Sequence, residues 1–298
     1  MVTQVESRRM TSLPAEETRR LVQRIVDLPA LPIVVPQMLR MVEDQRSSAG
    51  DLARVIGSDQ GLASRILRLA NSAFYGFRRE IVTINHAVVL LGFDTVRSIV
   101  LAATVFDTLN EGDVVSNFNR GQFWLHVGMT AAAARRLART LRAADPEAAF
   151  VGGLLHDVGK VVLDRFFYRR YAEAARLAAE GPCLIREAEV ALFNTNHAEV
   201  GRWLTERWRF PAAIVEPVGF HHRPNAAAPE YRNLASVVHL ADILTRNAGI
   251  GSGGDLLVPL PDAEAVSRFN IGGADLARWT EELVLERDAV EAFLQVMR

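Results

Sequence analysis

The sequence predicts an all-α protein, and three observations support this fold class. Apolar residues recur at helical spacing through nearly the whole chain, as in 17-ETRRLVQRIVDL-28, where Leu21, Ile25 and Leu28 share one face. The alternation typical of strands is scarce, and no fixed-period repeat is present. Of the 298 residues, 49% are hydrophobic, which is enough for one large core or two smaller ones.

Capping residues and prolines predict where the first helices begin and end. After the helix at 17–28, the prolines of 29-PALPIVVP-36 favour extended backbone, and a helix follows at 37–44. Ser48 or Asp51 can cap a helix at 51–59, and Asp59 can cap the next one at 60–73. The same helical period predicts the remaining helices at 81–91, 94–109, 121–143, 147–155, 157–165, 168–180, 184–193, 197–208, 211–221, 231–247 and 276–295. Between the last two, the Gly- and Pro-rich stretch 248–262 predicts a loop.

Composition excludes several classes of protein. The net charge of −1 gives no broad electrostatic footprint for nucleic acid, and the Arg-rich helix 134–144 is more typical of a solvated face. The single cysteine, Cys183, excludes an internal disulfide and suits a reducing compartment, where it reads as a small apolar side chain. The N-terminus shows no apolar signal region, and the longest apolar runs, such as 98–106, are too short to span a membrane. We therefore expect a soluble, cytoplasmic protein.

A cluster of potential metal ligands is the main functional signal. Six of the seven histidines fall between residues 126 and 239, and in 152-GGLLHDVGK-160 His156 is followed directly by Asp157. Imidazoles and carboxylates together suit zinc, iron, manganese or nickel, and a helical bundle can hold one or two such ions. Adjacent helical residues diverge by about 100°. His156 and Asp157 could therefore reach a metal at a helix end from two sides, with Asp157 as a bridge.

Each candidate also has a purely structural interpretation. His126 can be a hydrogen-bonded core histidine, and His197 can be a first-turn capping residue after Asn194 and Asn196. The pair His221–His222 can be an exposed helix C-terminus, and Asp242 a surface carboxylate. Two histidines stay outside the predicted ligand set. His239 is expected either on another face from Asp242 or behind it as a supporting residue, and His86 in local packing. Only the ordered set favours metal binding.

The order His126, His156–Asp157, His197, His221–His222, Asp242 resembles that of the HD superfamily of metal-dependent phosphohydrolases. Within it, the chain looks like an HDOD-domain protein over roughly residues 20 to 245. The segments that carry the resemblance are 28-LPALPIVVPQML-39, 56-IGSDQGLASRILRLANSAFYG-76, 81-IVTINHAVVLLGFDTVRSIVL-101, 148-AAFVGGLLHDVGK-160, 197-HAEVGRWLTERWRFPAAIVEPVGFHHRP-224 and 237-VVHLAD-242.

The resemblance implies an N-terminal helical subdomain packed on an HD-like metal-site bundle. The expected parts are an arm at 1–19, the N-terminal helical part at 20–112, the bundle at 113–247, and a loop with a helical tail at 248–298. It also implies a signalling output module with no established catalysis, whose expected partner is a protein of a sensor or response-regulator pathway. Nucleic acid and membrane are not expected partners, and the oligomeric state stays open.

Many HDOD proteins lack a complete metal set, but here every HD-type ligand position is filled. In this the chain is similar to the cyclic di-guanylate phosphodiesterases of the HD-GYP branch. It departs from them after His222, where 223-RPNAAAPEY-231 has no Gly-Tyr-Pro signature. It also carries Gln122, one turn before His126, where several of those enzymes have a glutamate ligand. Both departures weigh against cyclic di-guanylate hydrolysis.

Lys160 lies one turn past His156–Asp157 and has two interpretations. It could meet a substrate phosphate as a point charge, or it could be a solvated helix residue, paired with Asp157 or Asp164. If the site is catalytic, the reaction would be metal-assisted hydrolysis of a nucleotide or phosphoester. Between the two classes of protein, the sequence favours the regulatory HDOD module with a metal site over the phosphohydrolase.

Overall fold

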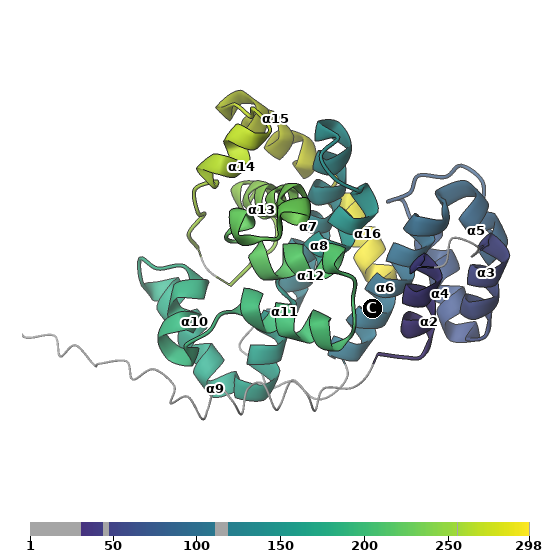
Figure 1. Ribbon diagram of the computed structural model, residues 1–298, viewed down its shortest axis with the longest axis horizontal. Coiled ribbons are helices and arrows are strands. Elements are labelled where there is room, and N and C mark those ends of the chain that lie inside the picture. Colours follow the sequence, from purple (N-terminus) through teal and green to yellow (C-terminus); the bar gives the residue numbers. More distant parts are fainter. Residues whose placement is uncertain (1–30, 44–47, 111–118, 255, 298) are drawn as a thin grey trace, which may run out of the picture.

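The computed structural model describes residues 31–43, 48–110, 119–254 and 256–297. Within these ranges it confirms the all-α prediction, because they form helices, turns and loops and no strand (Figure 1). The predicted arm at 1–19 and the predicted helix at 17–28 lie outside the described residues. By length and hydropathy, no single described helix could cross a membrane, and only the pair Ile84–Leu91 and Phe93–Leu109, bent by 119°, meets that test together.

The N-terminal helices form a cluster at one side of the molecule (Figure 1). They are α2 (Val34–Glu43), α3 (Ala49–Gly57), α4 (Gln60–Ala70), α5 (Ile84–Leu91) and α6 (Phe93–Asn110). Two predicted caps are confirmed. Ser48 Oγ accepts from the Asp51 amide at 3.2 Å, and Asp59 Oδ1 accepts from the Leu62 amide at 3.0 Å. These side chains satisfy first-turn amides that the helix itself leaves without partners.

The second group of helices surrounds the buried helix α7 (Arg120–Leu141). It comprises α8 (Pro146–Leu155), α9 (Val158–Glu180), α10 (Ile185–Phe193), α11 (His197–Arg207), α12 (Ala212–Phe220), the short turns η1 (Pro224–Ala226) and η2 (Pro229–Tyr231), and α13 (Arg232–Asn247). Helices α8 and α13 pack directly on α7. The two helices predicted at 157–165 and 168–180 are confirmed as the two arms of α9. They meet at a kink at Phe167, the one residue of α9 whose backbone leaves helical geometry.

Glycines let these helices approach closely where the site is built. A Cβ at Gly153 would lie 2.9 Å from Ala131 Cα, so α8 and α7 cross backbone to backbone. At Gly159 a Cβ would overlap the carbonyl oxygen of His197, which brings the first turns of α9 and α11 together. Both crossings bring helix ends with candidate ligands close to one another.

The C-terminal tail differs from the prediction. One helix was expected at 276–295, but the chain forms α14 (Ala263–Arg268), α15 (Gly273–Val284) and α16 (Arg287–Met297). The break follows from burial: α15 packs on α13, whereas α16 packs on α4 and α7, and Leu285 between them is 84% exposed. Helix α16 lies between the N-terminal cluster and the bundle (Figure 1), and one hydrophobic core extends from Leu31 to Met297.

Candidate metal centre

Four helix ends and two helix middles carry the seven predicted ligands. His156 ends α8, Asp157 stands between α8 and α9, and His197 is the first residue of α11. The pair His221–His222 directly follows α12, whereas His126 and Asp242 come from the middles of α7 and α13. His126 Nε2 lies 3.2 Å from Asp242 Oδ1, although 116 positions of sequence separate them. The fold brings all seven side chains together.

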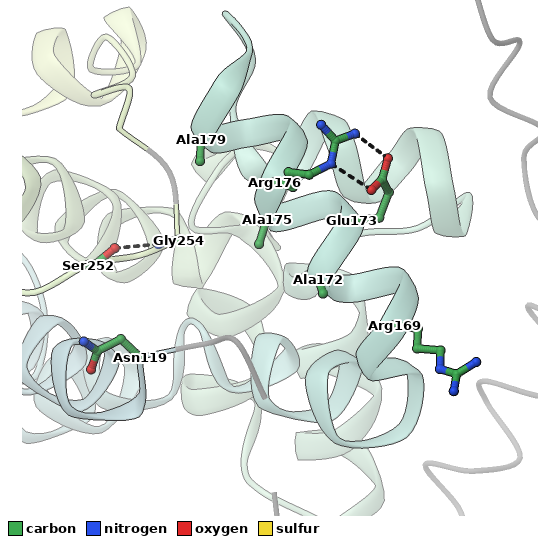
Figure 2. Close-up of a pocket in the computed structure, with 9 residues that line it drawn as sticks. All are labelled: Asn119, Arg169, Ala172, Glu173, Ala175, Arg176, Ala179, Ser252 and Gly254. Atoms are coloured by element: carbon green, nitrogen blue, oxygen red, sulfur yellow. Dashed lines mark hydrogen bonds and ion pairs between the residues drawn. The ribbon is translucent and has the colours of Figure 1, made fainter. Parts of the chain in front are cut away.

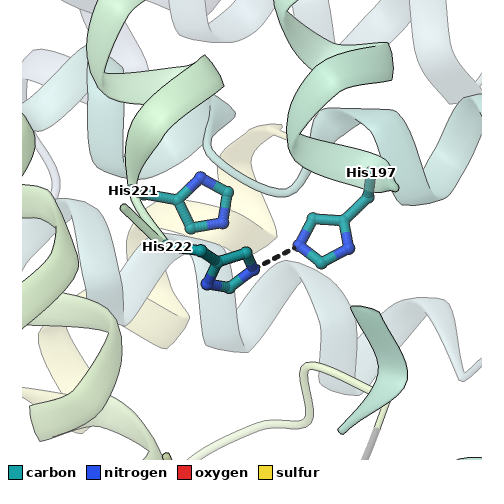
Figure 3. Close-up of side chains that lie close together, drawn as sticks. All are labelled: His197, His221 and His222. Atoms are coloured by element: carbon teal, nitrogen blue, oxygen red, sulfur yellow. Dashed lines mark hydrogen bonds between the residues drawn. The ribbon is translucent and has the colours of Figure 1, made fainter. Parts of the chain in front are cut away.

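Asp157 lies at the centre, with one carboxylate oxygen toward each half of the cluster. Its Oδ2 is 3.5 Å from His126 Nε2 and 3.4 Å from His156 Nε2. Its Oδ1 is 3.2 Å from His197 Nε2 and 3.9 Å from His221 Nε2. The structure therefore contains two groups that could hold a metal: His126, His156 and Asp157, and a second group of His197, His221 and His222 (Figure 3).

Hydrogen bonds at the far ring nitrogens orient three of the imidazoles. His156 Nδ1 lies 2.7 Å from the Gly153 carbonyl oxygen, and His221 Nδ1 lies 2.8 Å from that of Val218. His197 Nδ1 contacts Glu189 Oε2 at 2.6 Å. Since a carbonyl or carboxylate oxygen can only accept, each Nδ1 carries the proton and each Nε2 turns a lone pair inward. This arrangement is usual for metal-binding histidines.

Several inward-facing atoms are buried without a hydrogen-bond partner. They are Nε2 of His126, His156 and His221 and Oδ1 of Asp157. A buried polar atom without a partner costs about 1–3 kcal/mol, so four of them at one point need an explanation. A divalent cation would satisfy all four, because imidazole nitrogen and carboxylate oxygen are the donors that zinc, iron, manganese and nickel accept. The residues present therefore fit a metal.

The pKa shifts of the site also indicate that its buried carboxylates favour a bound positive charge. Burial alone would raise the pKa of Asp157, but the neighbouring His156 and the Lys160 ammonium hold that pKa well below its usual range. Burial would lower the pKa of His126, yet its contacts with Asp157 and Asp242 raise it. Burial would also lower the pKa of His197, but the charge of Glu189 outweighs this effect and the pKa is raised. In the absence of an ion, these two imidazoles attract protons to balance the buried carboxylates.

Two cationic side chains share the site with its carboxylates. Lys160 is fully buried, and its Nζ donates to Asp157 Oδ2 at 2.7 Å and to the Gly253 carbonyl at 2.6 Å. It is therefore not a solvated helix residue. Of the two predicted carboxylate partners, Asp157 and Asp164, the structure pairs it with Asp157. Arg246 Nε donates to Asp242 Oδ1 at 2.8 Å. The contact of Lys160 with a phosphate stays a prediction.

A short segment closes the Lys160 side of the site; we call residues 251–253 the strap. Ser252 N donates to the Gln122 carbonyl at 3.1 Å, and a Cβ at Gly251 would overlap the His126 amide. Gly251 has a φ of +72°, which glycine adopts without cost. The outer side of the strap borders a hollow of about 550 Å³ against α9 (Figure 2). The side chain of Gln122 is exposed, so only its backbone serves the site.

His239 supports the site without facing it. Its Nδ1 donates to the carbonyl of His221 at 2.7 Å, and its Nε2 accepts from the Asp262 amide at 2.8 Å. Both ring nitrogens are thus occupied, which agrees with leaving His239 outside the ligand set. His86 lies half-buried on α5, in neither candidate metal group.

Sequence reasoning missed three supporting residues. Glu189 accepts from both the amide and the ring of His197, but the seven intervening positions include a left-handed turn at Asn194 that no helical period reveals. Gly253 lies 93 positions from Lys160, so no local signal could connect them. The contact of Arg246 with Asp242 could have been predicted, because Arg246 stands four residues after Asp242 on a predicted helix.

Comparison with known proteins assigns the family and the fold. The family model for the HDOD domain matches residues 28–224. An HDOD domain protein of unknown function from Geobacter sulfurreducens is 26% identical with a TM-score of 0.78, covering 94% of this chain and 99% of that one. A proposed phosphohydrolase from Shewanella amazonensis SB2B is 27% identical with a TM-score of 0.72, covering 93% and 97%.

A relative known from sequence is an uncharacterized protein of Treponema pallidum (strain Nichols), 27% identical over 224 residues. The match covers 75% of this chain but 43% of the relative. This chain therefore corresponds to less than half of the relative's length.

Proposed function

Since this chain belongs to the HDOD domain family, we propose that it is a cytoplasmic, non-catalytic signalling module built around a His/Asp metal centre. The observation that carries the metal part is the set of buried Nε2 atoms on His126, His156 and His221 that have no hydrogen-bond partner. One or two ions of iron, manganese, zinc or nickel would be held by the seven side chains, with Asp157 between the two groups.

The closure of the first group, His126, His156 and Asp157, supports a non-catalytic role. Six of the seven candidate ligands are buried, and Lys160 with the strap covers the Asp157 Oδ2 side. Lys160 occupies the carboxylate oxygen that would face a metal in the first group. A hydrolase needs an open position for water and substrate at its metal. In this arrangement the ion would stabilise the fold or report on metal supply.

A metal-dependent phosphohydrolase is the second candidate. The placement of Asp157 between two ligand groups favours it, because paired ions can activate a water and polarise a phosphoryl oxygen. For this activity the strap would have to move away from Lys160. That lysine would then be free to contact a phosphate as a point charge.

A signalling module also needs a protein partner, and we propose one from a sensor or response-regulator pathway. The N-terminal helical part offers large apolar side chains to such a partner: Val82 is 64% exposed and Val89 on α5 is 76% exposed. Exposed apolar side chains of this size are typical of contact surfaces when they gather in one region.

The metal proposal is tested by elemental analysis of the purified protein and of two variants. Wild-type protein is expected to carry one or two ions per chain. Asp157→Ala removes the carboxylate that lies between the two groups and should lose them, whereas His86→Ala removes a half-buried histidine outside the site and should retain them. Wild-type protein with only trace metal would refute the proposal.

Catalysis is tested on the same preparation. Protein loaded with manganese or iron is incubated with bis(p-nitrophenyl) phosphate and with cyclic di-guanylate. We expect the wild-type protein to hydrolyse neither substrate faster than the Asp157→Ala variant does. Turnover that depends on Asp157 and on metal would favour the phosphohydrolase over the non-catalytic module.

A further inference from the structure

A pocket of about 440 Å³ opens at the outer edge of the second histidine group. Its polar lining includes Arg186, Asn196, His222 and Arg223. Among the seven candidate ligands, His222 is the one that is half-buried rather than buried, and it is the point where the pocket meets the metal centre. The pocket is lined by residues of α10, of the start of α11 and of the end of α12.

Arg186 is the feature of this pocket that its protein surroundings do not explain. It is half-buried, and among the described residues it makes no hydrogen bond and no ion pair. It also borders a smaller void with His222 and Arg246. A partly desolvated guanidinium without a carboxylate is costly, because its charge loses water and gains no partner. An anionic ligand in the pocket would supply the missing partner.

Arg223 makes one long ion pair, with Glu199, and stays largely exposed. Its side chain is 69% exposed, and the nearest carboxylate oxygen, Glu199 Oε1, is 4.0 Å away. The other oxygen of Glu199 already accepts from the Thr195 hydroxyl at 2.7 Å. The acidic group in the lining, Glu187, accepts from the Leu184 amide at 2.9 Å, where it caps the start of α10. The carboxylates near the pocket therefore leave the two guanidinium groups available.

We propose that this pocket binds a small organic phosphate of nucleotide size, with Arg186 and Arg223 contacting its phosphate. A guanidinium presents paired N–H donors that match two phosphate oxygens. Val190, which is 46% exposed, and Ala198 provide apolar surface for a ring. The volume falls within the range of small-molecule sites, about 300–1,000 Å³. The inference goes beyond the proposed function: a non-catalytic module would hold such a ligand as its signal and release it unchanged.

Isothermal titration with adenosine 5′-monophosphate tests the pocket, with adenosine as the matched ligand that lacks the phosphate. The wild-type protein should bind the nucleotide saturably and adenosine much more weakly, and inorganic phosphate should compete. The variant Arg186→Gln with Arg223→Gln should bind at least about tenfold more weakly, the loss expected for one or two charge-assisted hydrogen bonds. Arg223→Gln alone changes an exposed side chain, so it tests the pocket even if the double variant is unstable.

Arg54→Gln is the control variant, because it makes the same charge change at a side chain 79% exposed on α3. It should leave binding unchanged. The proposal is overturned if the wild-type protein shows no saturable binding of the nucleotide. It is equally overturned if adenosine binds as well as the nucleotide, or if the pocket variants bind like Arg54→Gln.

The titrations are run on metal-free and metal-loaded protein, which separates this inference from the proposed function. Nucleotide binding to metal-free protein that the pocket variants weaken supports the pocket even if no ion is ever found. Release of adenosine by the metal-loaded protein would refute the non-catalytic proposal and leave the pocket intact. Metal binding without nucleotide binding would refute the pocket alone.

Discussion

The imidazoles of the site differ in what holds their outer nitrogen. His156 and His221 contact backbone carbonyls of their own helix ends, which any sequence with the same helix would supply. His197 instead depends on a single buried carboxylate, Glu189, which contacts both its ring and its amide. A carboxylate partner makes an imidazole more basic and a stronger ligand, so Glu189 is the supporting residue with the largest expected effect.

Replacing Glu189 should weaken metal binding without removing a ligand. We expect Glu189→Ala to lower the affinity for metal by about tenfold to hundredfold, because His197 loses the group that fixes its ring orientation. Competition with a coloured chelator measures the affinity directly. Glu206→Ala, which removes a carboxylate with 49% exposure on α11, is the control and should bind metal like the wild type. Equal affinities for both variants would contradict this role for Glu189.

Acidification should destabilise the metal-free protein. Burial and the neighbouring histidines hold the pKa values of His221 and His222 well below the ordinary value of 6.5. As the pH falls through about 6.5, the unfolded chain takes up protons that the folded chain refuses, so the free energy of unfolding falls. The raised pKa values of His126 and His197 act in the opposite sense, with stabilisation that is complete at low pH and lost as pH rises.

We expect the two strongly lowered groups to outweigh the two raised ones. Urea unfolding of metal-free protein between about pH 7.5 and pH 5 should show the loss. The double variant His221→Asn with His222→Asn should flatten the profile. Stability that increases on acidification would mean that the raised groups dominate.

At the scale of the elements, helix crossings determine the site more strictly than helix propensity does. The first turns of α9 and α11 meet where Gly159 faces the carbonyl of His197 and lies near Gly201. This contact places Asp157 and His197 side by side, with 3.2 Å between Oδ1 and Nε2. A glycine at 159 is therefore a requirement of the site geometry as well as of packing.

The substitution Gly159→Ala should be strongly destabilising, because its Cβ would overlap backbone that cannot rotate away. We expect a loss of about 3 kcal/mol or more in the free energy of unfolding, together with weaker metal binding. Gly57→Ala provides the contrast: a Cβ there meets nothing within 4 Å at the end of α3, and the helix should gain up to about 1 kcal/mol. Denaturant unfolding of both variants measures the difference; a neutral Gly159→Ala would contradict the crossing.

Local sequence signals predicted most helices because each has its own cap or apolar face, as Ser48 and Asp59 illustrate. They also located the kink at Phe167, but they failed where the neighbouring elements decide, at the break between α15 and α16. The same limit applies to the site. The order of the seven side chains indicated a common centre, whereas Glu189 and the contact of Lys160 with Gly253 depend on tertiary packing.

At the scale of the whole molecule, the N-terminal cluster and the bundle share an aromatic contact that includes one buried cation. Arg135 on α7 donates to Glu147 at 2.8 Å, and its guanidinium carbon lies 3.9 Å from the ring centre of Phe150. Phe74 and Tyr75, which follow α4, lie over the same guanidinium at 5.4 and 5.6 Å. The segment after α4 therefore packs against α7 and α8, the helices that carry His126 and His156.

Helix α16 completes this contact through Phe293, whose ring centre lies 5.1 Å from Phe74 and 6.2 Å from Phe150. Phe293→Ala should cost about 3–5 kcal/mol, as for other buried aromatic residues. Because the cavity would open between the two parts, amide exchange should accelerate in both α4 and α7. Leu285→Ala, which changes a side chain that is 84% exposed, should alter neither stability nor exchange. Faster exchange confined to α16 would mean that this helix covers the core without joining its two parts.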